Sequence, residues 1–358
     1  MTKDAQAIDL EAVALDAARA NATSIPLLSV RDLSVEFTTD DGVVHAVDRV
    51  TFDVDRNETL GIVGESGSGK SVTSMAILGL LPKSAKISGE ILFDGQPLTT
   101  ATERELQKIR GRRIAMIFQD ALAALNPVHT VGRQIAEAIR VHQPKTTRAD
   151  LTARAIELLS TVGIPNPTER VDQFPHEYSG GMRQRAMIAM AISNEPDLLI
   201  ADEPTTALDV TIQAQVLDVL ERIQNRTESS IMLITHDLGV VAGVADRVVV
   251  MYAGRAVETG SVDDIFYTPK HPYAEGLLAS LPRLDRRADK ASRLHRITGQ
   301  PPSLIHIPSG CAFHPRCPYA EVPGRCSTDR PDLIEVGTLH RSSCFFPERV
   351  GTRVEDSP

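Results

Sequence analysis

Apolar positions along the chain fall into short runs typical of β-strands, separated by turns and by stretches with helical period. Residues 27–54 contain several such runs, and Asp40-Asp41-Gly42 between them has the composition of a β-hairpin turn. Residues 130–163 repeat their apolar positions with the period of an α-helix. Further strands are predicted at residues 59–63, 89–95, 113–118, 198–201, 231–235 and 247–251, and further helices at 71–81 and 183–192. This order predicts an α/β protein with a mostly parallel sheet covered by helices on both faces, carrying an antiparallel β flap and a helical insertion.

The segment Gly64-Glu65-Ser66-Gly67-Ser68-Gly69-Lys70-Ser71 joins the predicted strand 59–63 to the helix 71–81 and matches the pattern G-x-x-x-x-G-K-[ST]. Its glycines allow the backbone to wrap a triphosphate with the N–H groups pointing inward. Lys70 can reach the β- and γ-phosphates, and Ser71 can bind Mg²⁺. A chance glycine-rich turn would not require the flanking strand and helix, so the segment predicts a nucleoside triphosphate site.

The composition narrows the class of protein. The chain has 358 residues, 42% of them hydrophobic, which suits two or three packed units. A net charge of -9 argues against nucleic acid as a partner. The longest apolar stretch, residues 231–252, is interrupted by charged side chains, and the acidic N-terminus lacks the apolar core of a signal peptide. We therefore expect a cytoplasmic protein that works at a membrane only through a partner.

Two adjacent carboxylates follow the predicted strand 198–201. Asp202 at the strand end is placed to bind Mg²⁺ through its water shell. Glu203 is placed to polarise the water that attacks the γ-phosphate, as a general base. An ordinary strand with an acidic turn would explain the apolar run, but not two acids at one site.

The segment Tyr178-Ser179-Gly180-Gly181-Met182 precedes a predicted helix. A serine and two glycines at a helix N-terminus can bind anions, although Ser179 would also serve as a simple N-cap. With this segment the chain resembles the ATP-binding cassette (ABC) ATPases of ABC transporters, whose signature motif has this form. The resemblance implies that Ser179, Gly180 and Gly181 contact nucleotide phosphate. Gln is usual where Met182 stands, and no contact is assigned to that side chain.

The same resemblance implies roles for residues that would otherwise be read as structural. Gln119 corresponds to the Q-loop residue that contacts Mg²⁺ and water, and Asp209 to the D-loop residue. His236 corresponds to the switch histidine that holds the γ-phosphate, and Phe37 to the ring that stacks on adenine. The resulting candidate catalytic residues are Gln119, Glu203 and His236, and the candidate Mg²⁺ ligands are Ser71, Gln119 and Asp202.

The resemblance also implies partners. In this family two cassettes close head to tail over two ATP molecules, and each site combines the phosphate loop of one cassette with the signature serine of the other. We expect a second cassette ATPase, a paralogue, together with two transmembrane permeases and an extracytoplasmic solute-binding protein. The chain would then lie peripherally on the cytoplasmic face of the cell membrane.

The C-terminal third has a different composition, with more Pro, His and Cys. The motifs at residues 271–273, 299–303 and 311–318 resemble the C-terminal extension of oligopeptide/dipeptide importer ATPases, and residues 126–132 resemble the same branch. The branch also includes nickel and glutathione importers. The resemblance covers residues 28–346, and it implies ATP-driven import of peptides or a related small solute. The alternative is a soluble ABC-type ATPase that takes no part in transport.

The four cysteines of the chain all lie in this extension, at Cys311, Cys317, Cys326 and Cys344. Disulfides are unexpected in a reducing cytosol, and the tight C-x2-4-C pair typical of zinc sites is absent. Four thiolates can hold a [4Fe–4S] cluster, and the resembling segment of the family is associated with one. The spacing itself leaves a cluster, Zn²⁺ and free thiols open.

The expected organisation is therefore P-loop (RecA-like) α/β, with an antiparallel β subdomain, a helical insertion and a small Cys-containing extension. The predicted parts are a flexible tail at 1–26, a nucleotide-binding domain at 27–262, the extension at 263–346 and a flexible tail at 347–358. The helical subdomain is placed at about 120–185, within the nucleotide-binding domain.

Overall fold

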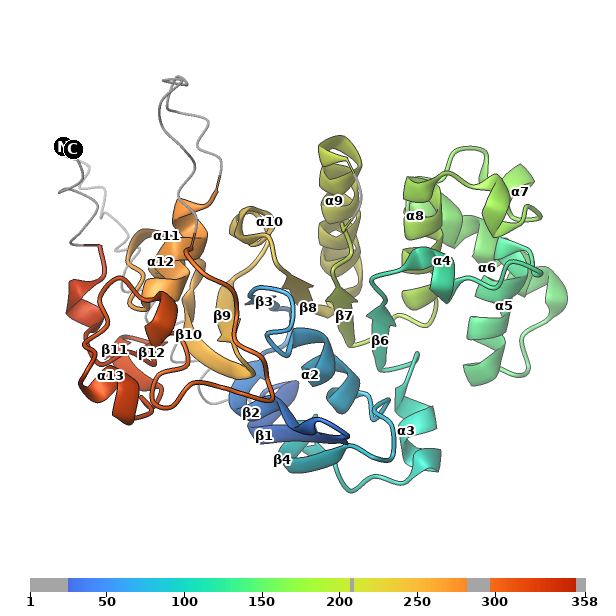
Figure 1. Cartoon of the computed structure of the whole chain (residues 1–358). Helices are drawn as coiled ribbons and strands as arrows, with labels where there is room; N and C mark the ends of the chain where they lie inside the picture. Colours follow the sequence, from blue (N-terminus) through green and yellow to red (C-terminus); the bar gives the residue numbers. More distant parts are fainter. Residues whose placement is uncertain (1–24, 207–208, 282–296, 352–358) are drawn as a thin grey trace, which may run out of the picture.

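The computed structural model describes residues 25–206, 209–281 and 297–351, so most of the two expected tails lies outside the described residues. In the described part, two sheets form the centre of the molecule (Figure 1). The four-stranded sheet has the order β2-β1-β4-β5, and the eight-stranded sheet has the order β11-β12-β10-β9-β3-β8-β7-β6. The first contains β1 (Leu28–Thr39), β2 (Gly42–Val54), β4 (Lys86–Phe93) and β5 (Gln96–Pro97). The second contains β3 (Thr59–Val63), β6 (Ile114–Ile117), β7 (Leu198–Asp202), β8 (Ser230–Thr235), β9 (Arg247–Tyr252), β10 (Arg255–Ser261), β11 (Ile334–Gly337) and β12 (His340–Ser342).

The inner strands of the large sheet run parallel, as the sequence predicts. β3 pairs with β8 and β9, and β7 pairs with β6 and β8, all in parallel. Their side chains alternate between two cores because successive residues of a strand point to opposite faces. On β7, Leu199 and Ala201 pack against the helical part, whereas Leu198 and Ile200 pack toward the antiparallel sheet. Both faces are thus covered, which explains why these strands read as continuous apolar runs.

The antiparallel sheet differs in detail from its prediction. The short β runs of residues 27–54 join into two long strands, β1 and β2, connected at the expected Asp40-Asp41 turn. The register between them shifts at several points, and Asp32 and Arg49 take positive φ there. These β-bulges interrupt the alternation of side chains, so the sequence pattern looks like several strands although the backbone is continuous.

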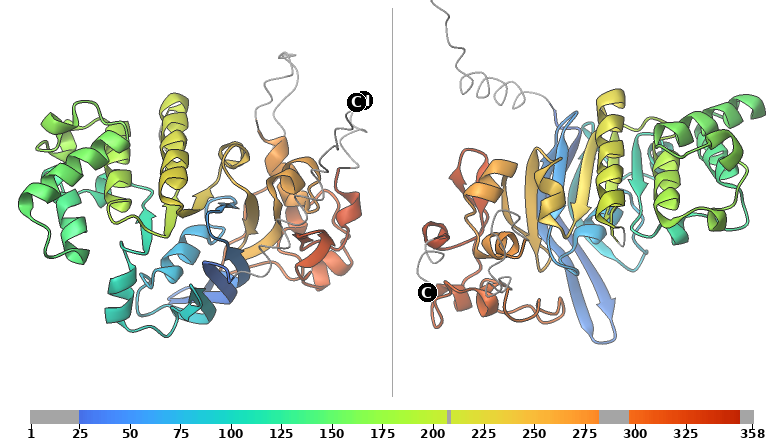
Figure 2. Two further views of the ribbon diagram at one scale, coloured as in Figure 1. Left: turned by 180° about the vertical axis from the view of Figure 1, so that it is seen from behind. Right: turned by 90° about the horizontal axis from the view of Figure 1, so that it is seen from above.

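Helices surround the large sheet and form a separate lobe beyond β6 (Figures 1 and 2). The lobe consists of α4 (Ala121–Ala124), α5 (Val131–His142), α6 (Arg148–Thr161), α7 (Pro167–Arg170) and α8 (Gly180–Ala191). Elsewhere lie α2 (Lys70–Ile77), α3 (Glu103–Ile109), α9 (Val210–Thr227), α10 (Leu238–Ala242), α11 (Val262–Tyr267), α12 (Pro272–Ala279) and α13 (Arg325–Thr328). Helix α2 ends earlier than predicted because Gly79, in the left-handed conformation at φ 61°, follows it.

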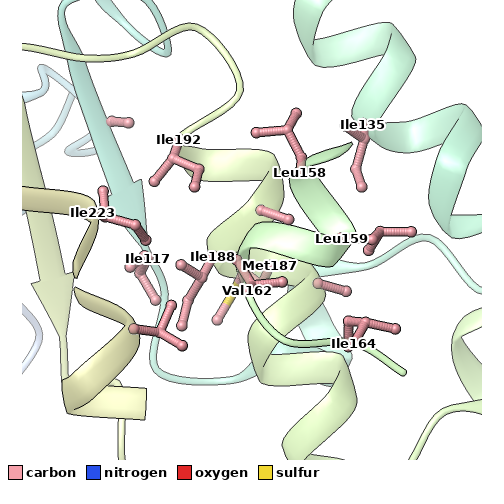
Figure 3. Close-up of a cluster of buried hydrophobic side chains, with 14 of the residues drawn as sticks. Ile117, Ile135, Leu158, Leu159, Val162, Ile164, Met187, Ile188, Ile192 and Ile223 are labelled. Atoms are coloured by element: carbon pink, nitrogen blue, oxygen red, sulfur yellow. The ribbon is translucent and has the colours of Figure 1, made fainter. Parts of the chain in front are cut away.

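The helical lobe is held to the sheet by one apolar cluster. Ile135 of α5, Leu158 of α6 and Ile188 of α8 meet Ile117 of β6 in this cluster (Figure 3). The helices begin where their caps dictate, since Thr130, Thr147 and Ser179 each accept a hydrogen bond from a backbone N–H of the first turn. The lobe therefore fixes the position of the N-terminus of α8.

The C-terminal extension does not stand apart from the cassette. Its strand β12 pairs antiparallel with β10, and β11 pairs with β12, so the large sheet continues into the extension. Glu258 of β10 is fully buried and accepts hydrogen bonds from the backbone of Lys270 and of His271 and from His340 Nε2 at 2.7 Å. Burial raises the pKa of Glu258, and its hydrogen bond with His340 opposes the rise.

Among the described helices, none has both the length and the apolar character needed to cross a lipid bilayer.

Because of His271, we expect the free energy of unfolding to decrease as the pH falls. It is almost fully buried, its Nδ1 accepts the N–H of Tyr273 at 3.1 Å, and burial lowers its pKa to about 3. The unfolded chain gains a proton at His271 below about pH 6.5, which the folded chain cannot gain. The free energy of unfolding contributed by His271 is thus fully present above pH 6.5 and is lost toward pH 3. In H271N, Asn keeps the capping acceptor without titrating. The slope of the free energy of unfolding against pH between pH 6 and 4 should therefore be smaller in H271N than in wild type by about 1.4 kcal/mol per pH unit.

Urea unfolding of wild type and H271N across this pH range measures the difference, and H306N, at an exposed histidine, is the matched control. Equal slopes for wild type and H271N would contradict the prediction.

Candidate nucleotide site

A cavity of about 470 Å³ opens at the carboxyl ends of the parallel strands. Its lining comes from the loop after β3, the segment after β6, the end of β7 and the end of β8. The carboxyl ends of parallel strands are where open α/β sheets bind ligands. The lining residues are Glu65 to Val72, Gln119, Glu203 and His236, all but Val72 among the predicted site residues.

The loop keeps its shape because certain positions accept only glycine. Gly69 has φ 100°, and a Cβ there would lie 2.5 Å from the backbone oxygen of Ala46. Gly64 has φ 156°, and a Cβ there would collide with the backbone oxygen of Met251. The loop backbone therefore packs directly against β2 and β9 and leads into the start of α2.

Lys70 lines the cavity, and its ammonium folds back onto the loop. Its Nζ donates to the backbone oxygens of Gly64 at 2.7 Å and Glu65 at 3.0 Å, and its side chain is nearly buried. Burial lowers its pKa, while the carboxylates of Glu203, Asp202 and Glu65 oppose the change. The ammonium is thus held against the loop backbone at the cavity, where it can bind a phosphate.

Asp202 and Ser71 form the candidate Mg²⁺ site. Ser71 Oγ donates to Asp202 Oδ1 at 3.1 Å, and Asp202 is almost fully buried. Burial raises the pKa of Asp202, and the hydrogen bond from Ser71 opposes the rise. A hydroxyl and a carboxylate are the hard oxygen donors that Mg²⁺ binds, so the pair fits this ion.

Glu203 is the most constrained side chain of the site. Its Oε2 accepts hydrogen bonds from Gln119 Nε2 at 2.9 Å and from Thr206 Oγ1 at 2.8 Å. Its Oε1 lies 3.3 Å from His236 Nδ1. Its backbone takes the left-handed φ of 48°, and its N–H donates to the oxygen of Ile234 on β8. The structure therefore brings all three predicted catalytic residues into contact and adds Thr206, which the sequence reasoning missed.

Other predicted residues lie outside this cavity. Ser179 and Gly180 are exposed at the start of α8 in the helical lobe, where Ser179 Oγ accepts the N–H of Met182. Phe37 is half-buried on β1 and packs against the core beneath the antiparallel sheet. Asp209 caps α9 by accepting the N–H of Ile212 at 3.0 Å. Its D-loop neighbours 207–208 lie outside the described residues, and the roles of Ser179, Phe37 and Asp209 remain predictions.

Two residues of the extension reach the phosphate loop without having been predicted to do so. Tyr273 Oη accepts the backbone N–H of Glu65 at 2.8 Å. The Arg316 guanidinium binds both oxygens of the Glu65 carboxylate, at 2.6 and 3.0 Å. In the sequence these residues stood out only as parts of family-like motifs, because no local pattern indicates a contact across 208 or 251 positions.

The four cysteines line one small, mostly apolar pocket of about 20 Å³. Burial raises the pKa of Cys311, that of Cys317 to about 12 and that of Cys344 to about 11. In the described part of the chain, no three or more His, Cys, Asp or Glu side chains are arranged to hold a metal ion. The donor set suits a four-thiolate group, but holding one requires the thiols to ionise and move.

The fold and this site together define an ATP-binding cassette ATPase. A family model for "ABC transporter" matches residues 47–206, and one for "Oligopeptide/dipeptide transporter, C-terminal region" matches residues 257–323. The chain belongs to the ABC-transporter ATP-binding proteins and, within them, to the oligopeptide/dipeptide branch.

The curated relatives agree. The chain is 55% identical to the oligopeptide transport ATP-binding protein OppD of Bacillus subtilis over 82% of each protein. It is 51% identical to OppD of Mycobacterium tuberculosis over 92% of this chain and 53% of that protein, so it spans about half the length of this relative. A dimeric bacterial ABC transporter cassette shares the fold with a TM-score of 0.60 and 24% identity, over 66% of this chain and 98% of that one.

Replacing Lys70 by Met should weaken ATP binding at least about tenfold, because the loop would lose its buried positive charge. The exposed Lys83→Met is the control and should bind ATP like wild type. Titration calorimetry with ATP and Mg²⁺ measures both, and equal affinity in K70M would remove Lys70 from the site.

Proposed function

We propose that the chain is the ATP-hydrolysing subunit of an ABC importer for di- or oligopeptides or a related small solute. The observation that carries the proposal is the position of Glu203 beside the phosphate loop, held by Gln119, Thr206 and His236. Gln119 and His236 come from segments far from Glu203 in the sequence, and all three line the cavity that the phosphate loop also lines. The names of the relatives support transport of peptides, and they do not favour a cassette without a transport role.

The residues divide the chemistry between them. The loop N–H groups and Lys70 would neutralise the phosphates, and Ser71, Asp202 and Gln119 would hold Mg²⁺. Bound Mg²⁺ would supply charge neutralisation at the transferred phosphoryl group. Glu203 accepts the proton of the attacking water, and Gln119 and Thr206 fix the carboxylate that receives it. His236 Nδ1 lies 3.3 Å from the other oxygen of Glu203, and in the imidazolium form its other ring nitrogen could donate to the γ-phosphate.

A second cassette completes each site. Ser179 and Gly180 are exposed at the N-terminus of α8, and a Cβ built on Gly180 meets nothing within 4 Å. They do not line the cavity of their own chain. A helix N-terminus with free backbone donors is suited to a phosphate supplied by a partner, here the ATP bound to a second, paralogous cassette.

The remaining partners follow from the branch. Two permeases, in contact with the cassettes at the cytoplasmic face of the membrane, and an extracytoplasmic binding protein would select the solute. We assign residues 27–262 to the nucleotide-binding domain, with Phe37 at the adenine and the helical subdomain at about 120–185. Residues 263–346 form the extension. One family model matches residues 47–206, inside the first part, and the other matches residues 257–323, most of which lie in the second part, and this supports the division.

For the extension we propose a [4Fe–4S] cluster on Cys311, Cys317, Cys326 and Cys344, with Zn²⁺ as the alternative. That all four cysteines line one pocket supports it. The role would be structural or sensing, since no redox step belongs to peptide import.

Glu203→Gln tests the catalytic assignment. The amide cannot accept the proton of water, so ATP hydrolysis should fall at least about 100-fold. ATP affinity should stay within a few-fold of wild type, because Glu203 contacts water rather than phosphate. Phosphate release and nucleotide binding are measured side by side, with E221Q at an exposed position of α9 as control. Unchanged hydrolysis in E203Q would contradict the catalytic assignment.

The transport assignment is tested separately by co-purification of the tagged chain from membranes. Failure of permeases to co-purify would argue against transport.

Anaerobic purification tests the thiolate site. The wild-type chain should carry about four iron and four sulfide per protein, and C326S should lose both. Zinc without sulfide would establish the alternative ligand, and a metal-free chain with four titratable thiols would refute both.

A further inference from the structure

The phosphate loop contains an acidic side chain at a place where negative charge opposes the ligand. Glu65 lines the cavity together with Lys70, and its side chain is 28% exposed. A carboxylate beside a triphosphate weakens binding unless another charge compensates it. The nearest compensation comes from the extension, in the form of Arg316.

The Glu65–Arg316 pair has the geometry of a strong ion pair. Both guanidinium nitrogens Nη1 and Nη2 contact the carboxylate, and the Arg316 side chain is only 5% exposed. Its Nε donates to the backbone oxygen of Thr298, and Nη1 lies 3.4 Å from Tyr252 Oη. A bidentate pair of this kind is directional, so it fixes the carboxylate as well as neutralising it.

Arg316 is itself held firmly. It ends a short 3₁₀ turn, His314–Arg316, which lies between Cys311 and Cys317. Phe313, at the start of that turn, packs on the rings of Tyr252 and Tyr273 with centroids 5.2 and 5.4 Å away. Tyr273 in turn accepts the N–H of Glu65, so backbone and side chain of this residue are both held from the extension side.

We infer that Arg316 is a positioning residue for ATP binding, which neutralises Glu65 and holds it so that the phosphate loop accepts a triphosphate. The inference rests on the proposed function, since it assumes that the loop binds ATP. It assigns the extension a direct part in nucleotide affinity. It also explains how the loop tolerates an acid at Glu65.

The charge argument gives a double-mutant test with a definite sign. In R316Q the uncompensated Glu65 should weaken ATP binding about tenfold or more. In E65Q/R316Q the repulsive charge is gone, and most of the lost affinity should return. R316K, which keeps the charge without the bidentate contact, should lie between wild type and R316Q. The defect of R316Q should also shrink at high salt.

If Arg316 has only a structural role, E65Q/R316Q should bind ATP as weakly as R316Q, since removing both partners cannot repair a misfolded loop. The dissociation constant for ATP with Mg²⁺ is measured by titration calorimetry on the full chain. The matched control is R341Q, at an exposed arginine paired with Glu335 on the edge hairpin, and its affinity should equal that of wild type.

R316Q that binds ATP like wild type, or E65Q/R316Q that binds as weakly as R316Q, overturns the inference while the proposed function stands. Wild type that binds no ATP overturns both. Should R316Q fail to fold, R316K and E65Q/R316K decide, because only loss of the bidentate hold on Glu65 predicts weaker ATP binding in R316K that E65Q restores.

Discussion

The parallel pairing of β3, β8 and β7 is the constraint on which the site depends. Each strand ends at the same edge of the sheet, and each delivers one part of the machinery there: the phosphate loop, His236 and the Asp202–Glu203 pair. Parallel strands require helical crossovers, which bury both faces and keep the edge rigid. The strained backbone of Glu203, whose N–H is bound to β8, persists because this rigid pairing holds it.

The elements with strong local patterns could be predicted from the sequence. The inner strands form as predicted, and the predicted phosphate loop and acid pair follow β3 and β7, because the glycines, the apolar runs and the adjacent carboxylates each encode one local geometry. The two long antiparallel strands were divided too finely, since β-bulges at Asp32 and Arg49 mimic turns in the pattern. The contact of Thr206 with Glu203 was not predicted, because a threonine after a strand has no distinguishing sequence pattern until the position of Glu203 is known.

Contacts across long stretches of sequence could not be predicted. One example is the pairing of strand β12 with β10. Another is the set of hydrogen bonds that Arg316 and Tyr273 make with Glu65 of the phosphate loop. Both depend on the folded chain as a whole. Ser179 shows another limit. Its proposed ligand is a phosphate bound to a different chain, and a single cassette displays Ser179 only as an exposed helix cap.

The separation of Glu65 and Arg316 has a consequence for the order of assembly during synthesis. The guanidinium is made 251 residues after the carboxylate it binds. At ribosomal speeds this delay amounts to about 13 to 50 s, during which the N-terminal strands and helices are already free to fold. The nascent phosphate loop thus spends that interval with an unneutralised acid. A cassette released before its C-terminal third is made would be a poor competitor for cellular ATP, and nucleotide occupancy becomes a marker of a finished chain.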